Sequence, residues 1–436
     1  MVSRQILGTG ESPSRYYTGV KLARHIRRIP TVIALVILLE SLANPAFATP
    51  QQSPPPGQVQ GGSAGTRSRV PNPRIEARKA PPLVLTPSWT IDLPSDPFPG
   101  AAIDAARGYV ALRSSELMAV GLAGGATAWR TPIEPIVGPV ATGDGLVFLA
   151  HARQIEAVDA VTGASRWQVP VDEPISALLL WHDHRLLVVT ERGSATMFRA
   201  ATGEILWTRS LGSSRIAPVA ADALVFVALD DGRVAALASE SGQTAWETKL
   251  AAPATTLASF GDRLYVGGGD KFLYCLSASR GKTEWRWRTG APAVGQMAVD
   301  AHHVYFAALD NVLRALNRGN GNQIWKAPLP HRPTAGVFLA SRLLWVPGVA
   351  PEVAAFQTID GSKVGVSPLA GEPAAAPQLK CSAPDRCEGL FVVTGEGKAQ
   401  WLVPGPPPLP WKAVPGLPAF TLPPEIKGYM PATGTP

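Results

Sequence analysis

Cysteine, long apolar stretches and catalytic signatures are all scarce in this chain of 436 residues. The sequence contains three cysteines, which is too few for a dense disulfide framework. The apolar run from Ile29 to Leu39 is much shorter than the roughly 20 residues that a membrane-spanning helix needs. Neither a phosphate-loop motif nor a His-Glu-x-x-His motif occurs. These absences exclude the readily recognised nucleotide-binding and zinc-protease classes.

The net charge of +7 is concentrated near the N-terminus. Residues 1–48 contain six basic and two acidic side chains, and residues 49–88 contain five and one. The remaining residues contain 29 basic and 30 acidic side chains, so this larger part of the chain is close to neutral. It therefore lacks the basic patch that is typical of nucleic-acid-binding proteins, and no nucleic-acid partner is expected.

The N-terminus has the organisation of a secretory signal peptide. Arginines precede the apolar run, and Ala46–Ala48 supplies a small-x-small cleavage site. We predict a signal peptide over residues 1–48, cleavage after Ala48, and a periplasmic or secreted protein. An uncleaved membrane anchor is the alternative, although the run is short for it. No cysteine follows the run, so a lipid-anchored N-terminus is not expected.

Two proline-rich segments flank the centre of the chain. Residues 49–88 are rich in Pro, Gln, Gly and Ser, and this composition predicts an extended linker without a folded core. Residues 404–436 contain a Pro-Gly-Pro-Pro-Pro-Leu-Pro stretch and are predicted to form a tail of the same kind. The folded domain is therefore expected between residues 89 and 403.

A repeat of 38 to 40 residues runs through this central region. Seven glycines mark it, and a tryptophan follows each of the first six glycines after three intervening residues. The pairs are Gly125 and Trp129, Gly163 and Trp167, Gly203 and Trp207, Gly242 and Trp246, Gly281 and Trp285, and Gly321 and Trp325. The seventh glycine, Gly361, is followed by Gly365 where tryptophan is expected. A period near 40 residues predicts a propeller or another repeat array.

Each repeat contains about four short strands. Runs such as Leu146–Leu149 and Leu224–Val227 are rich in aliphatic and aromatic residues, and turn residues bound them. Asp230-Asp231-Gly232 separates two such runs, as a hairpin link does. Four antiparallel strands per repeat predict an all-β fold, a single β-propeller. The tryptophans are expected to pack between neighbouring blades.

The chain ends supply one further blade. Residues 88–93 resemble the tryptophan strand of a unit, and residues 390–403 resemble the strands that this unit lacks. Joining them gives eight four-stranded blades, closed by the N- and C-terminal strands, with no open edge between the first and last blades. A seven-bladed ring is the alternative.

The stretch from Gly365 to Gly389 is the least regular part of the repeat region, and we expect a specialised surface there. It contains Cys381 and Cys387, for which we predict a local disulfide in an oxidising compartment. Cys275 stands where other repeats have alanine, so it is expected to be a buried, small apolar residue.

No catalytic, cofactor-binding or metal-binding residue is predicted. One aspartate in each of six repeats precedes a strand by a few residues, and turn formation explains this pattern. These aspartates are Asp104, Asp144, Asp183, Asp222, Asp262 and Asp300. The histidines of residues 182–184 and 302–303 occupy equivalent turns, and without convergent ligands they do not predict a metal site.

The repeat resembles that of the pyrroloquinoline-quinone-type propellers. Residues 157–167 carry Ala-Val-Asp-Ala-Val-Thr-Gly-Ala-Ser-Arg-Trp, and the segments 203–207 and 321–325 are similar. The resemblance covers roughly residues 89–403 and implies a propeller fold. Its family includes quinoprotein alcohol and sugar dehydrogenases. It also includes non-enzymatic scaffolds, such as the propeller subunit of the outer-membrane β-barrel assembly machinery.

The sequence departs from what the resemblance implies for the dehydrogenases. Those enzymes are implied to need calcium, a catalytic aspartate, a stacked quinone, a disulfide between adjacent cysteines and long insertions. This chain has no Cys-Cys pair, and its repeat spacing leaves no room for insertions between the first seven units. No cluster of Asp, Glu and Asn suggests the several oxygen ligands that calcium requires.

The first hypothesis is therefore an exported, non-enzymatic scaffold without a cofactor. It would bind envelope or secreted proteins or peptides, as a monomer or as a subunit of a complex, with a role in outer-membrane protein assembly. The second hypothesis is a pyrroloquinoline-quinone-dependent dehydrogenase of reduced form, with calcium. The third is a carbohydrate- or cell-wall-binding module.

Overall fold

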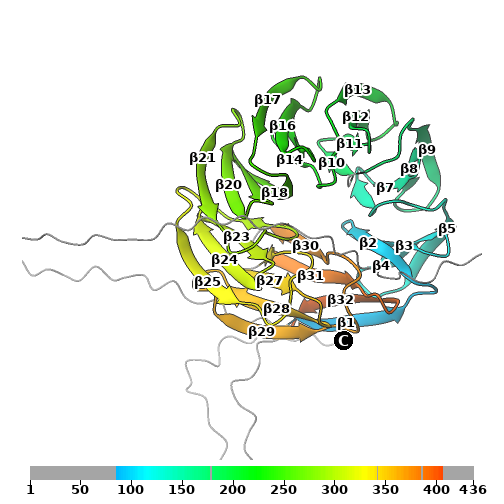
Figure 1. Cartoon of the computed structure of the whole chain (residues 1–436). Helices are drawn as coiled ribbons and strands as arrows, with labels where there is room; N and C mark the ends of the chain where they lie inside the picture. Colours follow the sequence, from blue (N-terminus) through cyan, green and yellow to red (C-terminus); the bar gives the residue numbers. More distant parts are fainter. Residues whose placement is uncertain (1–84, 177–178, 341, 384–385, 406–436) are drawn as a thin grey trace, which may run out of the picture. The chain divides into compact units, whose positions relative to one another are not determined.

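The computed structural model describes residues 85–176, 179–340, 342–383 and 386–405. Within these ranges the chain forms 32 strands in eight four-stranded antiparallel sheets, and they contain no helix that could span a membrane. The sheets follow one another around a central axis (Figure 1). This confirms the predicted eight-bladed β-propeller. The predicted signal peptide, residues 49–84 of the linker, and the tail beyond residue 405 lie outside the described residues.

Seven blades consist of four consecutive strands each, with the first strand next to the axis. Blade 1 contains β2 (Pro97–Ile103), β3 (Arg107–Leu112), β4 (Glu116–Gly121) and β5 (Thr127–Pro132). Blade 2 contains β6 (Ala141–Gly143), β7 (Leu146–His151), β8 (Gln154–Asp159) and β9 (Ser165–Pro170). Blade 3 contains β10 (Leu180–His182), β11 (Arg185–Val189), β12 (Ser194–Arg199) and β13 (Ile205–Ser210). Blade 4 contains β14 (Val219–Ala221), β15 (Leu224–Ala228), β16 (Arg233–Ala238) and β17 (Thr244–Lys249). Blade 5 contains β18 (Ala254–Phe260), β19 (Arg263–Gly268), β20 (Phe272–Ser277) and β21 (Thr283–Arg288). Blade 6 contains β22 (Ala298–Val299), β23 (His303–Ala308), β24 (Val312–Asn317) and β25 (Gln323–Pro328). Blade 7 contains β26 (Phe338–Ala340), β27 (Leu343–Pro347), β28 (Glu352–Gln357) and β29 (Lys363–Pro368).

Blade 8 joins the two ends of the propeller. It contains β30 (Gln378–Ala383), β31 (Arg386–Val393) and β32 (Lys398–Pro404) from the C-terminal side, and β1 (Leu85–Asp92) as its outermost strand. β1 and β32 pair antiparallel along their whole length and lie side by side in Figure 1. β1 begins at Leu85, four residues before the predicted start of the propeller at residue 89. β32 ends at Pro404, one residue beyond its predicted end at residue 403.

A row of three residues across the second, third and fourth strands forms the core of each regular blade. In blade 1, Ala119 in β4 lies opposite Tyr109 in β3 and opposite Trp129 in β5. Because the central residue is small, the two rings approach each other, with centroids 5.9 Å apart. Four other blades repeat this arrangement with centroid distances from 5.8 to 6.1 Å. The small residue of the repeat is therefore a spacer between two aromatic side chains.

Each tryptophan of the repeat joins its own blade to the next one. The Trp129 indole donates a hydrogen bond to the carbonyl of Ala160 in blade 2, and its ring lies on Gly163. A Cβ atom at Gly163 would come within 2.7 Å of that ring, and the glycine has a φ of +75°. Glycine is therefore required twice, for the left-handed backbone and for the close approach of the ring. The sequence spacing suggests a pair within one repeat, but the contact joins successive repeats.

Seven of the eight interfaces between blades contain this contact, with N–O distances between 2.7 and 3.2 Å. The donors are Trp89, Trp129, Trp167, Trp207, Trp246, Trp285 and Trp325. They lie on Gly125, Gly163, Gly203, Gly242, Gly281, Gly321 and Gly361, respectively. We call this contact the Trp–Gly interface.

The interface between blades 7 and 8 is different, and we call it the seam. Gly365 of β29 stands opposite Ala355, at the place of the tryptophan. In blade 8 the third and fourth strands are β32 and β1, so no glycine turn connects them. The seam instead contains the buried side chain of Leu85, whose backbone N–H donates a hydrogen bond to the buried Ser367 Oγ at 3.0 Å. The missing tryptophan and the missing glycine turn thus belong to one interface.

Candidate binding channel

The first strands of the blades and the connections that precede them surround a central cavity. A cavity of about 690 Å³ lies along blades 4 to 8. Its wall includes β18, the start of β14, and the connections that lead into β14, β22, β26 and β30. The lining residues on these elements include Ala217, Val219, Leu257, Ala258, Met297, Ala335 and Ala374. The larger hollow is therefore formed mainly by short aliphatic side chains.

A second cavity, of about 270 Å³, continues the channel toward blades 1 to 3. It is lined by residues of β2 and of the connection into β6, including Gly100, Pro139 and Val140. Ala375 and Ala376 line both cavities. These alanines lie within the irregular stretch from Gly365 to Gly389. That stretch therefore contributes a wall to the channel, at the point where the two cavities meet.

Four hydroxyl groups and the Gln296 amide line the larger cavity, and three of these hydroxyls are bonded to backbone carbonyls. Thr255 donates to Ala293, and Thr256 donates to Gly295, at 2.8 and 2.7 Å. Ser259 donates to the carbonyl of Ala220 at 2.7 Å. These hydroxyls therefore join adjacent blades and are not free to bind a ligand as donors. Among the described residues that line this cavity, one is charged, the exposed Arg215, whose guanidinium lies 3.5 Å from Asp230.

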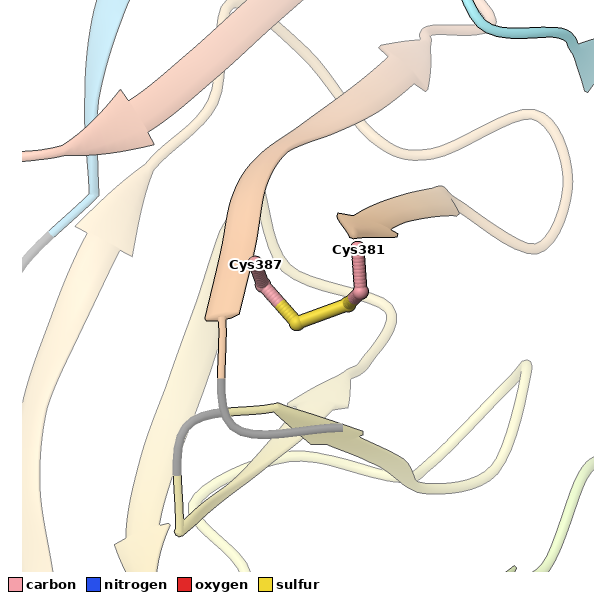
Figure 2. Close-up of a disulfide and its surroundings, with 2 residues drawn as sticks. All are labelled: Cys381 and Cys387. Atoms are coloured by element: carbon pink, nitrogen blue, oxygen red, sulfur yellow. A yellow bond between two sulfur atoms is a disulfide. The ribbon is translucent and has the colours of Figure 1, made fainter. Parts of the chain in front are cut away.

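A disulfide links Cys381 of β30 to Cys387 of β31 (Figure 2). It lies at the hairpin between the first and second strands of blade 8. Cys387 lines a small cavity of about 20 Å³ at the seam together with Leu85 and Trp345, and it lines neither cavity of the channel. Cys275 is a buried free thiol in β20, and burial raises its pKa to about 12. It is therefore unreactive as a thiolate near neutral pH.

Residues 113–259 and 230–383 match the family model described as outer membrane protein assembly factor BamB. The chain belongs to this family. Among solved structures, BamB from Moraxella catarrhalis aligns with a TM-score of 0.61 at 19% identity, over 73% of this chain and all of that one. Quinohemoprotein alcohol dehydrogenase from Comamonas testosteroni aligns with a TM-score of 0.61 at 13% identity, over 73% of this chain and 76% of that one. No curated protein matches the sequence.

These structural neighbours establish the propeller fold and leave its function open, because identities of 13 to 19% are too low to carry a function. A computationally designed protein, Ika8, aligns equally well, with a TM-score of 0.62 at 13% identity over 72% of this chain and 98% of that one. The BamB family and the alcohol dehydrogenases therefore share an architecture, and the chemistry of the channel has to distinguish them.

The described part of the channel does not fit a calcium–quinone centre. Hard cations such as calcium require six to eight oxygen ligands, several of them carboxylates. Among the described residues that line the two cavities, none is acidic. Across the same described ranges, no three His, Cys, Asp or Glu side chains converge as a metal site would require. The side chains of this wall therefore do not support a reaction through such a group.

The aspartates between first and second strands form turns, as predicted. Asp104 accepts hydrogen bonds from the backbone N–H groups of Ala106 and Arg107 and from the Tyr109 hydroxyl. Asp300 accepts the equivalent bonds in blade 6, including one from Tyr305. The tyrosine partners were not predicted. The signal was present as a tyrosine five residues after the turn aspartate in both repeats.

The two histidines of residues 182–184 also form contacts between blades. His184 Nδ1 lies 2.7 Å from Asp144 Oδ1, and the indole of Trp181 donates to the other oxygen of Asp144. His182 Nε2 lies 2.8 Å from the carbonyl of Asp222 in the next blade. These side chains therefore connect blades 2, 3 and 4 along one rim of the propeller.

Proposed function

We propose that this protein is an exported, non-enzymatic scaffold that binds segments of envelope proteins and acts in outer-membrane protein assembly. The observation that carries the proposal is the chemistry of the channel. The described wall of the larger cavity offers mainly short aliphatic side chains and three hydroxyls that are already bonded. Its other polar side chains are those of Arg215, Gln296 and Thr334, and none of its described residues is Asp, Glu, His or Cys. The description of its family as an outer membrane protein assembly factor supports the same role.

We place the contact with protein partners on one rim of the propeller. The hairpins between second and third strands and the connections between blades lie at the same end of the propeller, which we call the hairpin rim. Leu309, Val349 and Val137 are exposed there, in two hairpins and one connection. The opposite rim also exposes apolar residues, namely Val161, Phe260 and Ile359, so the assignment of partner binding to the hairpin rim is the part of the proposal that the following test decides.

Two positions in blade 7 allow a matched test. Val349 lies in the β27–β28 hairpin and is 45% exposed, while Ile359 lies at the opposite rim, between β28 and β29, and is 46% exposed. A photo-crosslinking residue at each position would report the partners of each rim in growing cells. We expect crosslinks to envelope proteins from position 349 and far fewer from 359. Equal yields at both positions would contradict a role for the hairpin rim.

A functional readout separates binding from assembly. Val349→Asp is expected to lower the amount of folded outer-membrane β-barrel protein in cells that depend on this chain, while Ile359→Asp leaves that amount unchanged. The charge disfavours an apolar contact at the hairpin rim, and the matched variant controls for a general effect of a new charge. Normal assembly in both variants would remove the support for this interface.

The alternative is a quinone-dependent dehydrogenase of reduced form. The alignment with quinohemoprotein alcohol dehydrogenase over 73% of the chain is the observation that favours it. Calcium-dependent binding of pyrroloquinoline quinone and turnover of an alcohol would support this alternative.

A further inference from the structure

His151, at the end of β7, is buried between two hydrogen-bond acceptors. Its side chain is 3% exposed. Its Nε2 lies 3.2 Å from Glu156 Oε2, and its Nδ1 lies 3.3 Å from the carbonyl oxygen of Pro135. A neutral imidazole has one N–H group, so one of its nitrogens would direct a lone pair at an oxygen. An imidazolium donates to both oxygens, and it is the form that satisfies this geometry.

We propose that the protonated His151 is a pH-sensitive latch that fastens the connection between β5 and β6 to the hairpin of blade 2. The connection spans residues 133–140. Besides the bond from His151 to Pro135, Ile136 forms a bridge with His151, and the Val137 N–H donates to the carbonyl of Ala150 at 2.8 Å. Loss of the proton would weaken the attachment of this connection. The latch does not depend on the proposed function.

The latch lies where the connection reaches two surfaces. Val137 is one of the exposed aliphatic residues of the hairpin rim. Pro139 and Val140 line the smaller cavity of the channel, and Pro139 packs on Gly100. The protonation state of His151 would therefore control how firmly part of the rim and part of the channel wall are held.

Charged groups from the neighbouring elements favour the imidazolium. β8 contributes Glu156, which is 7% exposed, and β9 contributes the neutral amide of Gln168, which donates to the other carboxylate oxygen at 2.9 Å. The connection contributes Glu134, and the hairpin contributes Arg153, whose guanidinium donates to the carbonyl of Asp172. The two acidic side chains that act on His151 therefore come from β8 and from the connection itself.

Burial disfavours the charge on His151, but other interactions outweigh it. The hydrogen bonds to Glu156 and Pro135 and the negative charges of Glu156 and Glu134 raise the pKa of His151 above its usual 6.5. The hydrogen bond with His151 lowers the pKa of Glu156 to about 2, against the opposing effect of burial. Both shifts favour the ion pair over the two neutral side chains.

The signs of the two shifts define the pH range of the latch. A raised histidine pKa contributes stability that is fully present below the unfolded value, near 6.5, and is lost as the pH rises through the folded value. The lowered pKa of Glu156 contributes stability that is present above the usual value of 4.5 and is lost as the pH falls from there toward about 2. The latch is therefore closed in mildly acidic solution and opens as the pH rises through the raised pKa of His151.

Blade 6 contains a matched connection without a titratable group. There Ala293 bridges Ala308, and the Val294 N–H donates to the carbonyl of Ala307 at 3.0 Å. Ala308 thus occupies the position of His151, and Val294 corresponds to Val137. The amide of Val294 is an internal control for any general effect of pH on the propeller.

Amide hydrogen exchange on the full chain tests the latch. Protection factors are measured from about pH 6, below the usual histidine pKa, up to about pH 9. We expect the protection of the Val137 amide to fall by about tenfold for each unit by which the pKa of His151 is raised, and that of Val294 to stay constant. His151→Gln keeps a donor for Glu156 without a titrating group, so its Val137 protection should not depend on pH. Constant Val137 protection in the native protein, or an unchanged pH dependence in His151→Gln, would overturn the proposal.

A titration of the His151 imidazole by NMR gives a second test that does not require His151→Gln to fold. We expect a midpoint above 6.5 in the native chain and a lower midpoint in Glu156→Gln, which retains the histidine and removes its anionic partner. A native midpoint at or below the usual histidine value would contradict the latch, as would a midpoint that Glu156→Gln leaves unchanged.

Discussion

The seven Trp–Gly interfaces of this propeller differ from the seam in the contacts that hold neighbouring blades together. At a Trp–Gly interface, an indole packs among aliphatic side chains of both blades, lies on a glycine and donates a hydrogen bond to the next blade. At the seam, Gly365 replaces the tryptophan, and Leu85 and Ser367 connect the two blades. The difference arises because the glycine turn lies between the third and fourth strands, and in blade 8 the chain ends lie there.

The comparison shows that the tryptophan of one repeat depends on the glycine turn of the next repeat. The tryptophan is useful only where the next blade offers a glycine turn to receive it. At the seam no such turn exists, and ring closure rests on the pairing of β1 with β32 and on the buried contacts of Leu85. The seventh repeat has therefore lost its tryptophan at the interface where the receiving element is missing.

The largest effect is expected from removing a tryptophan at a regular interface. Trp207→Ala should lower the free energy of unfolding by about 3–5 kcal/mol, because the buried indole leaves a cavity between blades 3 and 4. Ile205→Ala, in the same strand but exposed, should change stability by less than about 0.5 kcal/mol. Equilibrium denaturation with urea measures both. Similar losses in the two variants would contradict the packing role of Trp207.

The receiving glycine is expected to be nearly as sensitive. At Gly242 an added Cβ would come within 2.5 Å of the Trp207 ring, and φ is +66°. At Gly145 φ is +72°, but nothing lies within 4 Å of the added Cβ. Gly145→Ala should cost about 1–2 kcal/mol from backbone strain, and Gly242→Ala should cost a further amount of about 1–3 kcal/mol from overpacking. Equal costs in thermal or urea unfolding would show that the ring contact does not matter.

The seam should respond to a change that has no counterpart in the repeat pattern. Ser367→Ala removes the buried acceptor of the Leu85 N–H group, so we expect a loss of about 1–3 kcal/mol. Exchange of the Leu85 amide should accelerate most strongly, because this variant weakens the edge of β1. A uniform change in exchange over all eight blades would argue against a local role at the seam.

A smaller effect is expected within the blades. Tyr305→Phe removes the hydrogen bond to Asp300 and should cost about 1 kcal/mol. Tyr265 occupies the same position in blade 5, but its buried hydroxyl has no hydrogen-bond partner among the described residues. Tyr265→Phe should therefore be neutral or slightly stabilising. A larger loss for Tyr265→Phe than for Tyr305→Phe in urea denaturation would reverse this interpretation.

The residues compared in these variants also show which structural features could be predicted from the sequence. The spacing of Gly163 and Trp167 is a local pattern that repeats, so it identifies seven of the blades and the role of the turns. The eighth blade is predicted from the strand patterns at the two ends of the repeat region. The row of Tyr109, Ala119 and Trp129 could be recognised only in part, because the second-strand residue at this position varies among Tyr, Phe, Leu and Trp.

Contacts that occur once could not be predicted from a repeat. The bond from Leu85 to Ser367 joins residues 282 positions apart and has no equivalent elsewhere in the described ring. The latch at His151 depends on one carbonyl and one carboxylate that converge only after blade 2 has folded. The channel wall likewise combines residues from five blades, so its aliphatic character appears only in three dimensions.

Titration of the purified chain with pyrroloquinoline quinone, with and without calcium, tests most directly whether the propeller is a scaffold. Isothermal calorimetry would measure binding, and a dye-linked assay with alcohols and sugars would measure turnover. Because the described channel wall has no acidic residue, we expect neither saturable calcium-dependent binding nor turnover. Saturable, calcium-dependent binding accompanied by turnover would contradict the scaffold and establish a quinone-dependent dehydrogenase.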